Sequence, residues 1–239
     1  MSTDSAGVPW AGRSLTPQPF AGDDGSADAG LAAALAAGDA EQVAAALLTA
    51  RVLVPVVAVL GEDAAPIGPH GRPVDKSADM AVATLVGPDG RRALPGFSSS
   101  AALATWDAAR PVPAEGPRAA LSAVQDGCTA LIVDPAGPHP VLLPRPALWA
   151  LAQGRPWVPP HRDPEVADAV SAALAGLPDV ADTRLDAAPD AGLTVVLAVR
   201  PGLDADQLRA LLAQVRARLA GSELLAERAD ALALTVVRA

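Results

Sequence analysis

One group of charged side chains is dense enough in the sequence to suggest a site where a small molecule could bind or react. Its members are Arg72, Asp75, Lys76, Asp79, Arg91 and Arg92. Lys76 is the only lysine in a chain that otherwise uses arginine, which favours a specific role such as a compact donor in a cleft formed by the 61–79 loop. The same residues also fit a solvated loop, whose surface ion pairs contribute less than about 1 kcal/mol each. We prefer the solvated loop and keep the cleft as the alternative.

The residue types needed for nucleophilic or metal chemistry are present, but their spacing is unfavourable. Cys128 follows a predicted helix, whose C-terminal partial negative charge raises a thiol pKa instead of lowering it. His139 could approach it across a predicted hairpin, yet we expect Cys128 to be a buried apolar side chain. No two histidines are spaced i, i+4 on a helix, so no metal ion is expected. The histidines are His70, His139 and His161.

Two further segments match anion-binding sites only in part. Residues 61–71 follow a predicted strand as a phosphate-binding loop would, but they lack the GxxxxGK[ST] pattern and carry acidic residues. Ser98, Ser99 and Ser100 precede a predicted helix and could hold an anion at its N-terminus. Serine is also a preferred N-cap, and we expect capping here. The sequence therefore predicts no cofactor and no enzymatic activity.

The tryptophans are well suited to anchor a partner, because aromatic side chains dominate interface hot spots. Trp106, Trp149 and Trp157 each lie near the end of a predicted helix, where anchoring of a core is the usual role. Trp157 lies in a proline-rich stretch, so we expect it between two domains. We take Trp106 and Trp157 as candidate partner-binding residues.

Charge and cysteine content exclude several classes of partner and fold. The 239-residue chain has a formal net charge of −9, and no stretch of it is basic. Nucleic acids and anionic membrane surfaces are therefore not expected as partners. A single cysteine excludes a disulfide framework. An unknown protein partner, a small ligand and homo-oligomerisation all remain open.

Residues 43–61 imitate a membrane span, because they are mostly apolar and nearly long enough to cross a bilayer. Arg51 near the middle and Pro55 oppose that interpretation. A helix that runs into a buried strand explains the same residues, with Pro55 placing the strand at a sheet edge or a bulge. Residues 1–10 lack the basic and apolar regions of a signal peptide, so we expect a cytoplasmic protein.

Three segments of different composition must position these residues. Residues 1–29 are rich in Gly, Pro, Ser and Asp and predict a disordered leader. Residues 30–156 and 163–239 each combine apolar strand-length runs with periodic helical stretches, and the second has the order α-β-β-α-β. The proline-rich stretch 155–162 links them. We therefore predict an α+β protein with two domains, each a mixed β-sheet with helices packed mainly on one face.

Three stretches of the sequence follow the pattern of a known family. They are DMAVATLVGPDGRRALPGFSSSAALATWD at 79–107, AALSAVQDGCTALIVDPAGPHPVLLPRPALWALAQGR at 119–155, and the tail after WVPPHRDPEV. Together they resemble the SseB family, with an N-terminal and a C-terminal SseB domain over about residues 31–239. Gly96 departs from the pattern, because a larger apolar residue is expected before Phe97.

The family is named for an enhanced serine sensitivity phenotype, and the resemblance implies a bacterial cytoplasmic protein without an assigned activity or active-site motif. We expect a non-catalytic binding or adaptor protein. The alternative is a small-molecule, amino-acid-like sensor or an enzyme that uses the 61–79 loop cleft. A third class, an assembly protein, would use the exposed sheet face of the C-terminal domain.

Overall fold

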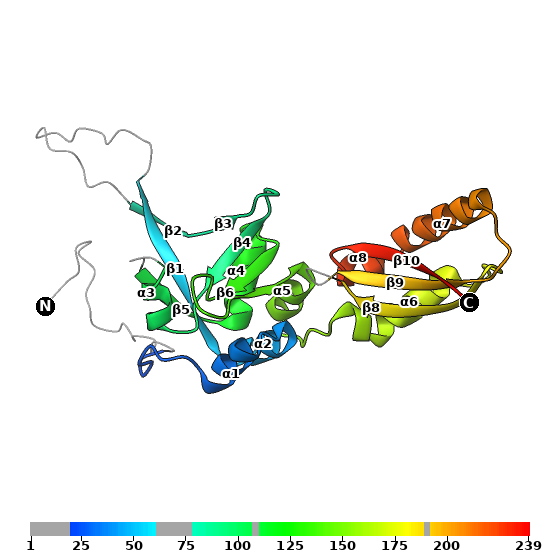
Figure 1. Ribbon diagram of the computed structural model, residues 1–239. Coiled ribbons are helices and arrows are strands. Elements are labelled where there is room, and N and C mark those ends of the chain that lie inside the picture. The colour runs from blue at the N-terminus through cyan, green and yellow to red at the C-terminus, as the bar shows by residue number, and fades with distance from the viewer. Residues whose placement is uncertain (1–19, 61–77, 107–109, 189–191) are drawn as a thin grey trace, which may run out of the picture.

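The computed structural model describes residues 20–60, 78–106, 110–188 and 192–239 (Figure 1). Two lobes with separate hydrophobic cores follow each other along the chain, which we call the N-terminal lobe (residues 20–157) and the C-terminal lobe (residues 160–239). Both combine helices with β-sheets, and parallel and antiparallel strand pairs occur together. The predicted α+β class is confirmed.

Two sheets and five α-helices build the described part of the N-terminal lobe. Its elements are α1 (Ala29–Ala37), α2 (Ala40–Leu47), β1 (Arg51–Leu60), β2 (Ala78–Val82), β3 (Leu85–Val86), β4 (Arg92–Gly96), α3 (Ser100–Ala104), β5 (Arg110–Glu115), α4 (Gly116–Gln125), β6 (Ala130–Val133), β7 (Val141–Leu143) and α5 (Arg145–Ala152). One sheet is antiparallel, with the order β2-β1-β5, and the other has the order β3-β4-β6-β7, with β4 and β6 parallel. Helix α4 contacts α5 and strands of both sheets.

Residues 43–61, which imitate a membrane span in sequence, are divided between α2 and β1, as predicted. Asp39 caps α2, because its Oδ1 accepts hydrogen bonds from the Glu41 and Gln42 N–H groups at 2.9 and 3.2 Å. None of the described helices combines the length and the hydropathy needed to cross a bilayer.

Strand β1 is the central strand of its sheet, so the edge position predicted from Pro55 is wrong. The Leu53 N–H donates to the Phe97 carbonyl, and the Pro55 carbonyl accepts from Ala83, so both residues direct their main-chain groups away from β5. Pro55 therefore stands opposite Pro111 of β5 at a position where neither needs an N–H for their pairing. On its other side, Pro55 lies beyond the last paired residue of β2, so the N–H group that proline lacks is not needed for that pairing either.

Two glycines permit close packing around β4 and α4. A Cβ atom at Gly96 would stand 2.7 Å from Cγ2 of Val52, which explains why the larger residue expected before Phe97 is absent. A Cβ atom at Gly116 would overlap the Leu47 carbonyl at the end of α2. These contacts bring β1 close to β4 and the end of α2 close to the start of α4.

The end of the predicted disordered leader is held against the N-terminal lobe. Arg51 donates through Nε and Nη2 to both carboxylate oxygens of Asp23, at 2.5 and 2.9 Å, and through Nη2 to the Ser26 carbonyl at 2.6 Å. The Ser100 N–H donates to the Gly25 carbonyl at 2.9 Å. Disorder therefore does not describe residues 20–29, whereas residues 1–19 lie outside the described part.

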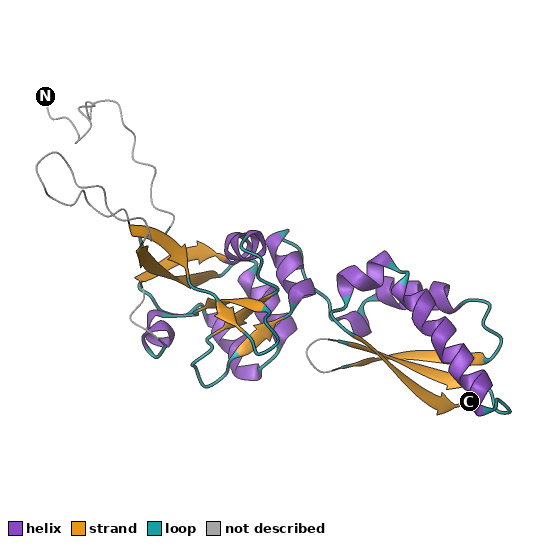
Figure 2. Cartoon of the chain, turned by 90° about the horizontal axis from the view of Figure 1, so that it is seen from above, coloured by secondary structure: helices purple, strands orange, loops and turns teal. Residues whose placement is uncertain are grey.

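One three-stranded sheet covered by helices on one face forms the C-terminal lobe. Its elements are the 3₁₀ turn η1 (Pro160–Arg162), α6 (Pro164–Leu174), β8 (Val180–Ala187), β9 (Leu193–Val199), α7 (Ala205–Ala220), α8 (Glu223–Arg228) and β10 (Leu232–Arg238). The sheet order is β10-β9-β8, with β9 and β10 parallel. Alternate residues of β9 are buried against the helices, all of which lie on the same side of the strands (Figure 2). This is the predicted α-β-β-α-β order with α8 added.

Charged side chains join the two lobes. Arg145, at the start of α5, donates from Nε to Asp230 Oδ1 at 2.9 Å and from Nη2 to the Ala226 carbonyl at 2.7 Å. Arg162 of η1 pairs with Glu41 of α2. The first set of bonds places α8 beside α5, at the point where the linker leaves the N-terminal lobe.

Candidate functional site

Most of the predicted charged cluster cannot be placed. Arg72, Asp75 and Lys76 lie outside the described residues, and so does the side chain of Asp79, whose main chain belongs to β2. The cleft predicted from the 61–79 loop therefore stays a prediction. Arg91 and Arg92 are the two members whose side chains the structure describes.

Arg91 and Arg92 contact the elements around their own strand. Arg91 is exposed and pairs with Asp89 in the preceding turn, and this contact holds the pKa of the Asp89 carboxyl below its usual range. Arg92 donates from Nη1 to the Asp126 carbonyl at 2.9 Å, so it joins β4 to the C-terminal end of α4. Both also line a shallow cavity of about 510 Å³ on the β3-β4-β6-β7 sheet, whose other walls include Ile132 and Leu142.

The three described tryptophans lie in different environments. Trp106 is half-buried and packs against Phe97, with ring centroids 5.3 Å apart, in a small cluster with Leu53 and Leu103. Trp157, expected between the domains, belongs to the core of the N-terminal lobe and also lines a cavity whose wall includes Glu227 and Arg228 of α8. Among the described tryptophans the exposed one is Trp149 of α5, at 46%. Its helical position gave no sign of this exposure in the sequence.

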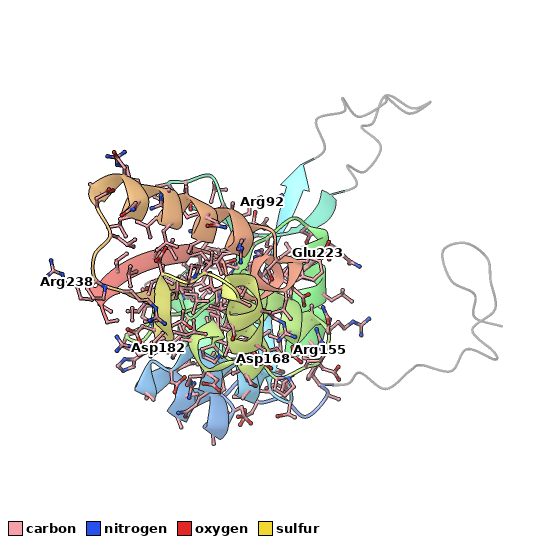
Figure 3. All side chains as sticks on the ribbon, turned by 90° about the vertical axis from the view of Figure 1, so that its right-hand side faces the viewer. Arg92, Arg155, Asp168, Asp182, Glu223 and Arg238 are labelled. Atoms are coloured by element: carbon pink, nitrogen blue, oxygen red, sulfur yellow. The ribbon has the colours of Figure 1, made fainter. Side chains whose placement is uncertain are left out.

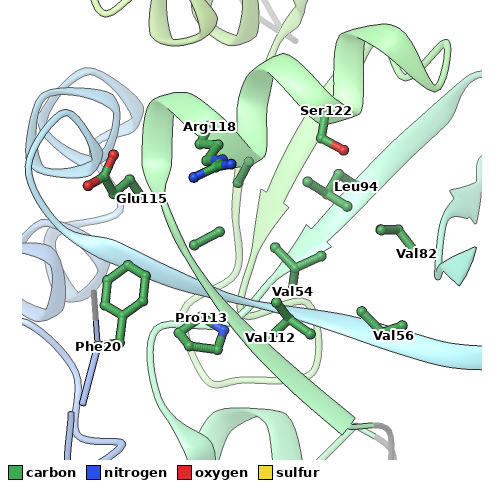
Figure 4. Close-up of a pocket in the computed structure, with 12 residues that line it drawn as sticks. Phe20, Val54, Val56, Val82, Leu94, Val112, Pro113, Glu115, Arg118 and Ser122 are labelled. Carbon is green, nitrogen blue, oxygen red and sulfur yellow. The ribbon is translucent and has the colours of Figure 1, made fainter. Parts of the chain in front are cut away.

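A groove of about 560 Å³ lies between α4 and the β2-β1-β5 sheet (Figure 4). Its lining residues are Phe20, Val54, Val56, Val82, Leu94, Val112, Pro113, Ala114, Glu115, Arg118, Ala119 and Ser122. We call it the α4 groove. The strands supply an apolar floor, whereas Arg118 and Ser122 project from α4 on the opposite wall (Figure 4). Phe20 closes one side of the groove. It is held there because Asp23, three residues later in the chain, bonds to Arg51.

The polar rim of the α4 groove carries unpaired charge. Arg118 and Glu115 are both exposed, and neither forms an ion pair or a side-chain hydrogen bond with any other described residue. They occupy the first turn of α4 and the residue before it, and Glu115 provides no side-chain cap for the helix. An apolar floor with a guanidinium at its edge that no described side chain engages is suited to a ligand that combines apolar groups with a carboxylate.

A buried polar network lies at the ends of β4 and β6, outside the groove. The Asp134 carboxylate accepts from the Ser98 N–H at 2.8 Å and from the Ser98 hydroxyl at 2.6 Å, and both residues are buried. Arg51 donates to the Ser98 carbonyl at 2.5 Å. Asp134 also has a positive φ of 51°, which Asp tolerates better than most residues. The network joins the ends of β4 and β6 and, through Arg51, the leader at Asp23.

Ser99 and Cys128, considered above for anion-binding and nucleophilic roles, contribute to the fold. Ser99 caps α3, accepting from the Ala102 N–H at 3.0 Å, as predicted. Cys128 is 4% exposed, and burial raises the pKa of its thiol, which outweighs the opposite effect of Arg92. Neither Ser98 nor Cys128 lines the α4 groove. Among the described residues, no group of three His, Cys, Asp or Glu side chains could hold a metal ion.

Comparison with known proteins identifies the N-terminal lobe. The family model described as SseB protein N-terminal domain matches residues 28–150, which is about half of the chain. The match begins at the residue that caps α1 and ends within α5, so it includes both sheets of the lobe and every described wall of the α4 groove except Phe20. No curated protein and no solved structure matches the chain. The chain belongs to the SseB family.

Proposed function

We propose that this SseB-family chain is a non-catalytic binding protein that acts as an adaptor, and that the α4 groove receives an amphipathic segment of a protein partner. The observation that carries the proposal is the combination of a large apolar floor with Arg118 at its rim, whose side chain bonds to no described residue. A volume of about 560 Å³ is within the range of specific binding sites, roughly 300–1,000 Å³.

The chemistry of the walls defines the segment. The floor, with Val54 and Leu94 at its base, favours aliphatic or aromatic side chains. Arg118 favours a carboxylate placed beside those side chains, because a guanidinium binds carboxylates through two donors. The whole chain has a net charge of −9, so long-range attraction does not bring an acidic partner. Local contact at Arg118 must therefore provide the selectivity.

Two side chains support the non-catalytic part of the proposal. The hydroxyl of Ser98 is engaged by the Asp134 carboxylate, and Cys128 is buried with a raised thiol pKa. A nucleophile needs an accessible, activated oxygen or sulfur, and neither residue meets that requirement in this environment.

The test uses an exposed residue of the groove and a matched residue outside it. Val112 is 43% exposed at the groove wall, and Leu121 is 46% exposed on α4 without lining the groove. Affinity-tagged chains carrying Val112→Asp or Leu121→Asp are used to recover partners from the native cell, and each recovered protein is then purified and titrated against both variants. Relative to the unsubstituted chain, we expect at least a tenfold loss of affinity for Val112→Asp and less than a twofold change for Leu121→Asp. Equal affinity for the two variants, or no partner that binds in purified form, would contradict the proposal.

A further inference from the structure

Strand β10 forms an edge of the C-terminal sheet and pairs, among the described residues, only with β9. The Ala231 carbonyl accepts from the Leu193 N–H at 2.8 Å. The Ala239 N–H donates to the Val199 carbonyl at 3.1 Å. Because successive strand residues direct their main-chain groups to opposite sides, the odd-numbered residues of β10 bond to β9 and the even-numbered residues face the free edge. These even-numbered residues are Leu232, Leu234, Val236 and Arg238.

The side chains along this edge are apolar and exposed. Leu232, Val236 and Val237 are 40%, 39% and 43% exposed. Leu232 and Val236 lie in register with Leu193 and Leu197 of β9, which are fully buried beneath the helices. The helices therefore cover β9 and leave β10 open on the same face. A further strand beside β10 would bury this apolar surface and also satisfy the free main-chain groups.

The other edge strands that the structure describes carry features that oppose pairing with a further strand. Strands β3 and β7 are two and three residues long, β2 includes Asp79, and β5 includes two prolines. Strand β8 has a register shift and carries Asp182, Arg184 and Asp186. Short length, charge, proline and bulges are the usual means by which sheets block their edges. Strand β10 has seven residues, no proline and one charge, on Arg238, which projects outward from the surface (Figure 3).

Two copies of β10 are complementary when they run antiparallel about a two-fold axis at Thr235. Free-edge residues then stand opposite free-edge residues, so that Leu234 pairs with Val236 of the second copy. About eight main-chain hydrogen bonds join the strands in this register. Thr235 stands opposite its own copy on the other face, and such threonine and aliphatic pairs stabilise a sheet. The remaining pairs are Leu232 with Arg238 and Ala233 with Val237.

The distribution of charge favours a second copy as the occupant. A net charge of −9 keeps copies of the chain apart, but residues 231–237 are uncharged. Arg238 stands opposite Leu232 and not opposite itself, so no like charges meet. We propose that β10 pairs antiparallel with β10 of a second copy and joins the two three-stranded sheets into one continuous sheet. The two-fold pairing uses the free edge of both copies, so the assembly closes as a dimer.

This dimer does not depend on the function proposed for the α4 groove, because no residue of β10 lines that groove. Each copy therefore keeps its own groove open, and the dimer presents two of them.

The test is sedimentation equilibrium of the full chain with charges placed at the two-fold axis. We expect the unsubstituted chain to form a dimer. Thr235 is exposed, and Thr235→Lys or Thr235→Glu places like charges opposite each other, so each variant alone should dimerise at least tenfold more weakly. An equimolar mixture of the two should recover the dimer, because lysine then stands opposite glutamate. The matched control is Ala187→Lys, at an exposed residue of β8 on the other edge of the sheet, and it should leave the dimer unchanged.

Two proline variants separate pairing between copies from the fold of each copy. The Val236 N–H faces the free edge, whereas the Val237 N–H faces β9. Val236→Pro should therefore weaken dimerisation at least tenfold and melt near the temperature of Thr235→Lys, and Val237→Pro should melt at a lower temperature.

A monomeric unsubstituted chain overturns the proposal and leaves this edge to a strand of a different protein. Assemblies larger than a dimer also overturn it, because the two-fold pairing closes. Undiminished dimerisation of Thr235→Lys, or a mixture with Thr235→Glu that stays monomeric, contradicts the pairing about Thr235 and has the same consequence.

Discussion

The contact between Asp23 and Arg51 leads to a prediction about the leader, because it joins residues 20–28 to strand β1. The perturbation is Asp23→Asn, which keeps the shape of the side chain and removes its charge. Asp23 accepts two hydrogen bonds from Arg51, at 2.5 and 2.9 Å, and a third from the Gly25 N–H at 2.9 Å. The two side chains are 19% and 11% exposed, so solvent screens the pair only in part.

The magnitude follows from these bonds. A hydrogen bond to a charged group contributes about 1.5–3 kcal/mol and a neutral one about 0.5–1.5 kcal/mol. Asparagine can still accept one bond, and Arg51 keeps its bonds to the Ser26 and Ser98 carbonyls. We therefore expect Asp23→Asn to lower the free energy of unfolding by about 1–2 kcal/mol, or the melting temperature by about 4 °C.

The pH dependence provides the assay. Arg51 holds the pKa of the Asp23 carboxyl below its usual range in the folded chain, so the stabilisation is present above the unfolded value of about 3.9. It is lost as the pH falls through the folded pKa, where protonated Asp23 becomes equivalent to asparagine. Thermal unfolding followed by circular dichroism should show the difference at pH 7 and its progressive loss as the pH falls below the unfolded value.

The control is Asp24→Asn at the next residue, whose carboxylate bonds only to Ser26 and should change the melting temperature less. Asp24 is fully exposed, so its lowered pKa reflects local bonds and not attachment of the leader. The reasoning would be refuted by equal melting temperatures of wild type and Asp23→Asn at pH 7, or by a difference that persists unchanged into acid.

Two further predictions concern the packing of the N-terminal lobe. Gly116→Ala places a Cβ atom on the Leu47 carbonyl and should lower the free energy of unfolding by about 3 kcal/mol, whereas Gly221→Ala, whose Cβ meets only ordinary contacts, should be nearly neutral in the same denaturant titration. The Cys128 thiol should react with a colorimetric disulfide reagent at pH 8 only after denaturant is added, because burial raises its pKa and blocks access; rapid reaction of the native chain would contradict its buried environment.

The sequence predicted the elements whose patterns are local. The capping residues Asp39, Ser99 and Asp204 are recognisable from residue type and spacing, and Asp204 forms a capping box with Gln207. The division of residues 43–61 into a helix and a strand followed from Arg51 and Pro55. These predictions succeeded because each depends on neighbours within a few residues.

The elements that were missed depend on distant partners. Strand β5, with the sequence RPVPAE, carries two prolines that oppose a strand assignment, and it forms because Pro111 and Pro113 stand opposite residues of β1 that direct their main-chain groups elsewhere. The order of the leader depends on a guanidinium at residue 51 meeting a carboxylate at residue 23. No pattern within either segment contains that information.

Two tryptophans show the same limit. Trp149 lies in a predicted helix, where core anchoring is the usual role, and Trp157 in a proline-rich linker, where a position between the domains is expected. In the structure Trp149 is exposed, whereas Trp157 is buried in the N-terminal core beside the linker. Exposure of a large side chain depends on which face the neighbouring lobe leaves uncovered, and this is a property of the tertiary fold.

The bonding of the arginines separates those that build the fold from one available to a partner. Arg51, Arg92 and Arg145 each donate to a main-chain carbonyl far away in sequence, so their positive charge serves to join elements. Arg118 lines the α4 groove without bonding to any described side chain. Since a guanidinium with no partner at the edge of an apolar surface gains most from an incoming carboxylate or carbonyl, Arg118 is where charge reversal should reduce binding and leave stability unchanged.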